Sequence, residues 1–184
     1  IDSTCIKFDK IFAGKLDDFI SLDGKLSDNS KDKLTLSFAG IDLAALNQLS
    51  KKENEKEKEG SLEMNLEGIM NGEITVSDVY NDFLFESDVT VKDFSLNKSP
   101  YGKVTIRSEW DPQRKVAVIK AMNDFEGSKL FDISGTYSPS SKNADISATA
   151  IKLPLNILNS IVKSFASDVR GLGAGRIRLY GKLN

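Results

Sequence analysis

The fold class is decided by the stretch Val104-Thr105-Ile106-Arg107-Ser108-Glu109-Trp110, in which apolar and polar side chains alternate. Successive side chains of a strand point to opposite faces, so this pattern predicts a β-strand with one apolar face and one wet face. The same alternation recurs at 34–38, 62–66, 74–76, 89–91, 131–137 and 177–183, with turn residues between the runs. The chain is therefore predicted to be mainly β, a long antiparallel meander.

A many-stranded sheet with one continuous apolar face has to close, pair with another sheet or curl around something apolar. We therefore expect the meander to form an open trough or a sandwich. Leucines spaced three residues apart near 43–50 predict a short amphipathic helix. Apolar residues spaced three and four residues apart over 154–166 predict a second one, and both are expected to dock on the apolar face. The second helix is expected to begin at Pro154 and to lie against Ile177 and Leu179. A change of apolar parity predicts a bulge near 92–93.

An internal repeat organises the chain. Leu34, Leu43 and Leu46 correspond to Ile146, Leu155 and Leu158 at one offset, and Gly24, Gly60 and Gly68 correspond to Gly135, Gly173 and Gly181 at nearly the same offset. We interpret residues 1–71 as the tail of one repeat unit and residues 72–184 as one full unit, together one continuous segment of a larger protein. The charged run 51–59 has no counterpart in the second copy, so we interpret it as a solvated insertion.

The composition argues against several function classes. The chain contains no His and one Cys, Cys5, which excludes nucleophile pairs with His, zinc sites with His and an intrachain disulfide. The 25 Lys and Arg against 27 Asp and Glu give a net charge of −2, which argues against nucleic-acid binding. No stretch approaches the roughly 20 apolar residues of a membrane-spanning helix.

No pattern of residues singles out a catalytic centre. The glycine-rich loop 171–175 is expected to open a strand, whereas a phosphate-binding loop opens a helix. The acidic clusters lack the spacing of a calcium loop. We therefore expect no enzyme activity, metal or cofactor. Arg107, Arg176 and Arg178 are predicted on the wet face, where the basic excess after Ala144 suits anionic headgroups or a partner surface.

The second half of the chain has the spacing of a known repeat. A strand over 144–150 leads into Leu153-Pro154-Leu155-Asn156-Ile157-Leu158, and Val169-Arg170-Gly171-Leu172-Gly173-Ala174-Gly175 opens the last strand. This arrangement resembles the repeating segments of the TamB family, the translocation and assembly module proteins of the Gram-negative envelope, within the AsmA-like group. The resemblance is strongest over 72–184 and reaches 1–71 through the repeat.

The resemblance implies a function without catalysis. Members of that family are long periplasmic proteins anchored in the inner membrane, with a β-sheet trough that is apolar inside. They are associated with outer-membrane protein assembly and with phospholipid transport between the membranes. The partners implied here are phospholipid acyl chains, neighbouring repeats of the same chain and, through regions outside this segment, the outer-membrane assembly machinery.

The candidate lipid-facing residues are the apolar members of the alternating runs. They are Leu34, Leu36, Phe38, Leu62, Met64, Leu66, Ile74, Val76, Val104, Ile106, Trp110, Phe131, Ile133, Ile146, Ile177 and Leu179. Two alternatives stay open at this point. The same residues are also what a closed core would bury, and a surface sandwich for adhesion or glycan binding would show the same alternation.

Overall fold

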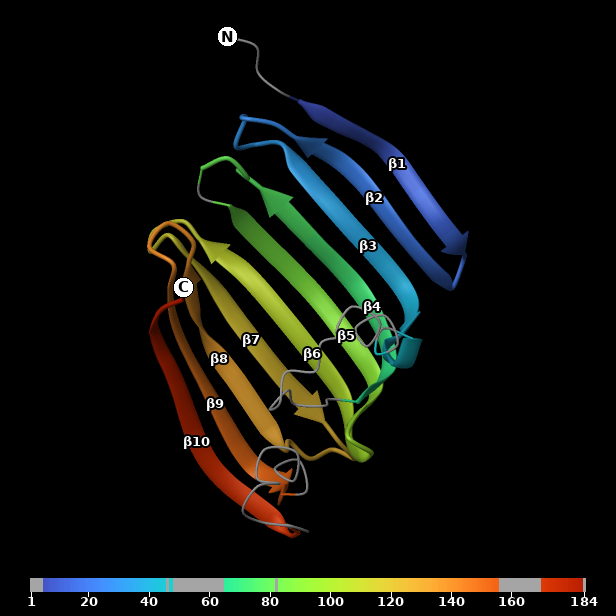
Figure 1. The fold of residues 1–184 in the computed structure, drawn as a ribbon, viewed down its shortest axis with the longest axis vertical. Coiled ribbons are helices and arrows are strands. Elements are labelled where there is room, and N and C mark those ends of the chain that lie inside the picture. Colours follow the sequence, from blue (N-terminus) through green and yellow to red (C-terminus); the bar gives the residue numbers. More distant parts are fainter. Residues whose placement is uncertain (1–4, 46, 48–64, 82, 156–169, 184) are drawn as a thin grey trace, which may run out of the picture.

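The structure, a computed structural model, describes residues 5–45, 47, 65–81, 83–155 and 170–183. Ten β-strands account for most of these residues (Figure 1). They are β1 (Ile6–Lys15), β2 (Asp18–Leu26), β3 (Lys33–Asp42), β4 (Leu66–Ser77), β5 (Leu84–Leu96), β6 (Ser99–Asp111), β7 (Val116–Asp124), β8 (Phe131–Ser138), β9 (Asn143–Pro154) and β10 (Leu172–Lys182). The prediction of a mainly β chain is confirmed.

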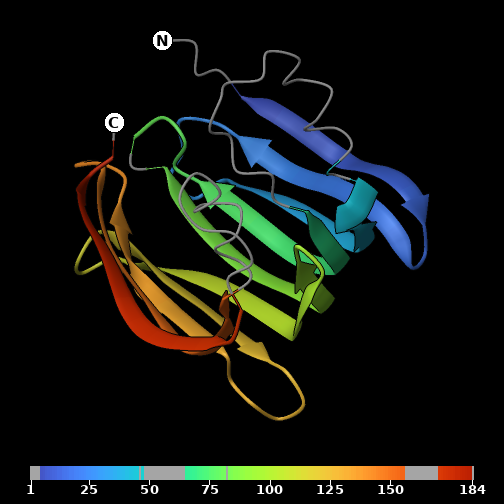
Figure 2. The ribbon, with the colours of Figure 1, turned by 60° about the horizontal axis from the view of Figure 1, so that its bottom comes forward.

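All ten strands belong to one antiparallel sheet, in the spatial order β1 to β10, so each strand pairs with its neighbours in sequence. The predicted meander is confirmed. A sandwich needs a break in this order where the chain crosses to a second sheet, and the described strands contain no such break. The sandwich is therefore wrong, and the strongly curled trough is corrected to an open sheet with free edges at β1 and β10 (Figure 2).

One face of the sheet is crossed by an unbroken row of apolar residues. Residues directly opposite each other on paired strands place their side chains on the same face. The pairing connects, from β1 to β10, Ala13, Ile20, Phe38, Gly72, Val89, Ile106, Ala121, Ile133, Ala148 and Ile177. We call the side of the sheet that carries this row the apolar face, and the opposite side the polar face.

β-bulges keep the apolar residues of irregular strands on the apolar face. In β5 the pairing shifts between Val91 and Phe94, and Asp93 has a φ of 52°. The extra residue restores Phe94 to the face that carries Val91, so the predicted bulge is confirmed. A bulge in β1 lies at Lys10, with a φ of 45°, and the Lys10 N–H donates to the Asp23 carboxylate over 3.1 Å.

The best-buried apolar cluster lies at the centre of the apolar face. Leu43, Val91 and Val104 form it, and Leu66, Met70, Phe94 and Phe131 pack around it. Tyr101 adjoins this cluster with only 1 % of its surface exposed. Its ring lies 5.9 Å from that of Phe94 and 6.0 Å from that of Phe131, within the range of favourable aromatic contacts.

Helix is almost absent from the described residues. A short helical stretch begins at Leu43, directly after β3, where the Asp42 carboxylate accepts the Ala44 N–H over 2.9 Å as a helix cap does. Leu43 packs on the sheet, as expected, but residues 46 and 48–50 of the predicted helix lie outside the described residues.

The second predicted helix is corrected at its start. β9 continues through Pro154, because Leu153 and Pro154 pair with Gly173 and Leu172 of β10. Only a short 3₁₀ turn follows at Leu155, and residues 156–166 of the predicted helix lie outside the described residues.

The internal repeat is reproduced in part by the strand pairing. Gly24 of β2 lies opposite Leu34 of β3, and Gly135 of β8 lies opposite Ile146 of β9, as the repeat predicts. The next strand departs from it, because Gly68 lies near the beginning of β4 whereas Gly181 lies near the end of β10. The expected superposition of these two glycines is wrong. Gly60 lies outside the described residues, and the division into 1–71 and 72–184 stays a prediction.

Candidate functional site

The structure places all the described candidate residues on the apolar face. They are Leu34, Leu36, Phe38, Leu66, Ile74, Val76, Val104, Ile106, Trp110, Phe131, Ile133, Ile146, Ile177 and Leu179. Leu62 and Met64 lie outside the described residues. The candidate site is thus a surface spread over the sheet rather than a cluster at one point.

Burial varies across the apolar face, and even in the central strand β6 Ile106 is 37 % exposed. In the central strands Phe38 and Val89 are 6 % and 7 % exposed. Toward the ends, Ile20 is 48 % exposed, and Ile177 and Leu179 are 74 % and 55 % exposed. The residues of the helix expected against Ile177 and Leu179 lie outside the described residues, so this contact stays a prediction. A closed core therefore describes only part of the face.

Alanines occupy most of the apolar face of β9. On this face β9 presents Ala144, Ile146, Ala148 and Ala150, with Ile133 of β8 opposite Ala148 on one side and Ile177 of β10 opposite it on the other.

A polar pair that the sequence pattern did not reveal lies within the apolar face. Ser87 of β5 and Ser108 of β6 face each other, and their hydroxyl oxygens are 2.9 Å apart. Ser108 is only 3 % exposed. Because each hydroxyl finds its partner in the other, the pair is buried without an unsatisfied group.

The polar face carries charged residues in a second row across the sheet. From β3 to β10 this row contains Ser37, Glu73, Asp88, Arg107, Lys120, Ser134, Ser147 and Arg178. Arg107 contacts Asp88 at 3.2 Å. Arg178 donates two hydrogen bonds of 2.8 Å to the carboxylate of Asp145. The prediction that Arg107, Arg176 and Arg178 lie on the wet face is confirmed.

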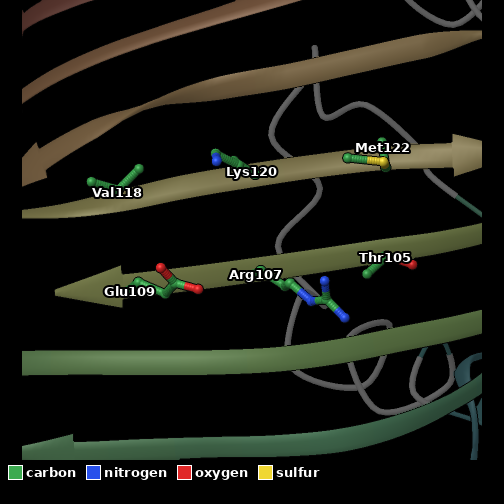
Figure 3. Close-up of a pocket in the computed structure, with 6 residues that line it drawn as sticks. All are labelled: Thr105, Arg107, Glu109, Val118, Lys120 and Met122. Atoms are coloured by element: carbon green, nitrogen blue, oxygen red, sulfur yellow. The ribbon is translucent and has the colours of Figure 1, made fainter.

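A shallow hollow of about 380 Å³ lies on the polar face between β6 and β7. Figure 3 shows its lining, which is Thr105, Arg107, Glu109, Val118, Lys120 and Met122. Charged and apolar side chains alternate there, and Met122 is 42 % exposed.

The contact between Arg178 and Asp145 and the burial of Tyr101 both shift pKa values. The Arg178 guanidinium, by donating hydrogen bonds, lowers the pKa of the Asp145 carboxyl below its ordinary value of 3.8. The same contact raises the pKa of Arg178. Burial raises the pKa of the Tyr101 hydroxyl above 10.0, and that hydroxyl has no hydrogen-bond partner among the described residues.

The described residues contain no group of three or more metal-ligating side chains. The helical residues among them form no segment long and apolar enough to cross a bilayer. Cys5 is exposed just before β1. Comparison with protein families, with curated proteins and with solved structures found no match. The functional conclusion therefore has to come from the two faces and the edges of the sheet.

Proposed function

We propose that the apolar face contacts phospholipid acyl chains, in a non-catalytic segment of a cell-envelope protein that serves phospholipid transport and outer-membrane biogenesis. The observation that supports this proposal most strongly is the unbroken apolar row from Ala13 to Ile177, which crosses all ten strands. Acyl chains lack hydrogen-bonding groups, so they suit a surface that presents side-chain methyl groups and no unpaired polar atom.

The size and exposure of the apolar face also favour this function. Neighbouring strands are about 4.8 Å apart, so a row over ten strands is on the order of 43 Å long, more than the roughly 30 Å of a bilayer core. Ile20, Ile177 and Leu179 remain about half or more exposed. Large exposed apolar surfaces on proteins mark contacts with partners, ligands or membranes.

The polar face suits an aqueous surrounding, because its ion pairs Arg107–Asp88 and Arg178–Asp145 are exposed. A sheet with one wet and one apolar face fits the proposed periplasmic location, in a whole protein anchored in the inner membrane. The sequence resemblance adds two proposed partners, neighbouring repeats of the same chain and the outer-membrane assembly machinery.

Trp110 provides a direct test of the proposed lipid contact. It is the single Trp of the chain, and it lies on the apolar face opposite Ala117. Phospholipids with brominated acyl chains quench a Trp that they touch. We expect them to quench Trp110 in the purified protein, whereas unbrominated phospholipids leave its fluorescence intensity unchanged.

The matched control moves the Trp to the polar face. In the double variant Trp110→Phe/Val118→Trp the new indole lies in the hollow between β6 and β7. We expect brominated chains to quench this variant far less than the parent. Equal quenching of the two proteins, or none of either, would refute contact between lipid and the apolar face.

A further inference from the structure

A second hollow, of about 560 Å³, lies over β8, β9 and β10 beside the turn between β6 and β7. Three arginines line it, Arg176 and Arg178 from the polar face of β10 and Arg114 from the turn. Among the described residues its lining has a single acid, Asp145, so the lining carries a net charge of +2. The hollow is thus positive in a chain whose net charge is −2.

The two arginines of β10 are held over the neighbouring strand β9. Arg178 donates two hydrogen bonds of 2.8 Å to the carboxylate of Asp145, and Arg176 donates to the Ser147 hydroxyl over 3.3 Å. Each guanidinium has more N–H donors than these contacts use. The contacts therefore orient both side chains and leave N–H donors for a ligand.

Hydroxyl groups and the turn complete the lining. Ser134 and Thr136 of β8 and Ser147 of β9 line the hollow, and Ser134 lies directly opposite Ser147. The Asp111 carboxylate accepts the Arg114 N–H over 3.0 Å, which holds the turn that carries this arginine. Guanidinium forks together with hydroxyl donors are the groups that bind phosphate oxygens in proteins.

The hollow does not depend on what lies beyond β10. Strands pair through N–H and C=O groups in the plane of the sheet, whereas the hollow opens on the polar face. Arg176 and Arg178 both reach inward, toward β9 and away from the outer edge of the sheet. A neighbouring repeat of the same chain can therefore pair with β10 and leave the hollow open.

We propose that this hollow binds the phosphate monoester group of an anionic ligand. A phosphate monoester carries a charge of about −2 at pH 7, which matches the +2 of the lining, whereas a diester carries about −1. The arginine N–H groups donate to the terminal phosphate oxygens, and the hydroxyls of Ser134 and Ser147 add further donors. The proposal concerns the polar face and does not rest on lipid at the apolar face.

The test is an NMR titration of the purified protein with glycerol phosphate, a soluble monoester, and with dimethyl phosphate, a diester. We expect glycerol phosphate to shift the amide signals of Arg114, Ser147 and Arg178 and to bind about tenfold more tightly than dimethyl phosphate. Equal affinity for the two compounds, shifts confined to other residues, or no binding of either compound would overturn the proposal.

The second proton of the ligand supplies an independent measurement. A phosphate monoester loses this proton near pH 6, and the chain contains no His, the side chain that ordinarily titrates there. The Asp145 carboxyl, whose pKa lies below 3.8, stays charged from pH 5 upward. Affinity for glycerol phosphate should therefore rise about tenfold from pH 5 to pH 7.5. An affinity that does not change over this range would contradict a site for the doubly charged group.

Two matched variants locate the site. Arg176→Gln removes a cation from the hollow and should weaken glycerol phosphate binding about tenfold. Arg107→Gln removes a cation from the same face in β6, outside this hollow, and should leave the affinity unchanged. Equal effects of the two changes would indicate general charge attraction and overturn the proposal.

Vesicles distinguish a lipid headgroup from a soluble ligand. Phosphatidic acid has a phosphate monoester headgroup. If the ligand is a lipid, adding phosphatidic acid to phosphatidylcholine vesicles should increase binding of the parent and not of Arg176→Gln. If the ligand is soluble, glycerol phosphate binds and the two proteins bind these vesicles equally. Either result supports the site. Binding to phosphatidic acid that persists in Arg176→Gln, by a protein that does not bind glycerol phosphate, would overturn it.

Discussion

The side chain of Asn123 holds the backbone of Tyr101 by a hydrogen bond of 2.8 Å from its amide to the Tyr101 carbonyl. The amide oxygen of Asn123 accepts two further bonds of 2.9 Å, from the N–H groups of Leu130 and Phe131. Asn123 is 3 % exposed and lies on the apolar face, opposite Val104. One buried amide thus joins the beginning of β6 to the beginning of β8.

Replacing Asn123 by Ala should destabilise the fold. The change removes all three hydrogen bonds, and each buried backbone group left unsatisfied costs about 1–3 kcal/mol. We expect urea unfolding to show a loss of about 2 kcal/mol or more. The matched control is Asn81→Ala, because Asn81 is exposed and bonds only to Asp78 at 2.7 Å among the described residues. Equal effects of the two changes would show that the Asn123 bonds add no stability.

The buried hydroxyl of Tyr101 should be dispensable. It has no hydrogen-bond partner among the described residues, so Tyr101→Phe removes an unsatisfied polar group and keeps the ring between Phe94 and Phe131. We expect the unfolding free energy to stay equal or to rise by up to about 1 kcal/mol. Tyr101→Ala should instead cost about 3–5 kcal/mol, as other aromatic truncations in cores do. A clear loss of stability in Tyr101→Phe would reveal a partner for the hydroxyl.

Tyr101 should also contribute to the alkaline limit of stability. Burial raises its pKa in the folded state above 10.0, so the folded protein holds this proton more tightly than the unfolded chain does. Its contribution is constant below pH 10 and decreases as pH rises above that value. The free energy of unfolding, measured from pH 8 to pH 11, should therefore decrease more steeply in the parent than in Tyr101→Phe. If the unfolding free energies of the two proteins depend on pH in the same way, the pKa of Tyr101 is not raised by folding.

The contact between Asp145 and Arg178 should be visible in an NMR titration of the carboxyl carbons. Arg178 lowers the pKa of Asp145 below 3.8, and the Arg178→Gln variant should return it toward that value. Because the folded pKa is depressed, the contribution of the contact to stability is present above about pH 4 and is lost as pH falls through the folded value. If the pKa of Asp145 is the same in Arg178→Gln as in the parent, the contact does not persist in solution.

Substitutions at two adjacent residues of β8 distinguish a loss of lipid contact from a loss of folding. Ile133 lies on the apolar face and Ser134 on the polar face. We expect Ile133→Arg to abolish quenching of Trp110 by brominated phospholipid, because an arginine on this face has to be desolvated against acyl chains. Ser134→Arg should leave quenching unchanged. Circular dichroism identifies any variant that fails to fold, and loss of quenching in Ser134→Arg alone would place the lipid on the other face.

The strands with strict alternation could be predicted from the sequence, because side-chain parity is a local property. The alternation does not indicate β1 or β2, and only the repeat points to β2. The bulge at Lys10 shifts the parity of β1, and Phe12 and Phe19 stack at 5.4 Å on the polar face, which removes the alternation from both strands. The run Val116-Ala117-Val118-Ile119 is apolar at every position, so alternation does not assign its faces; the structure places Val118 in the hollow on the polar face.

The candidate residues could be assigned to one face from the sequence, but their burial could not be predicted. Phe38 and Ile177 have the same place in the alternation, yet they are 6 % and 74 % exposed, and no local pattern distinguishes them. The hydrogen bonds of Asn123 could not be predicted from the sequence either. Its three partners are brought to it by the pairing of β6, β7 and β8, and no local pattern reports such contacts.

The central claim is that lipid meets the apolar face and not the polar face, and neighbouring residues in β6 test it most directly. A photo-crosslinking amino acid replaces either Ile106, which is 37 % exposed on the apolar face, or Arg107, which lies on the polar face. After irradiation of the protein in cells, we predict that phospholipid is recovered covalently bound at position 106 and not at position 107. Labelling at 107 with none at 106 would contradict the account.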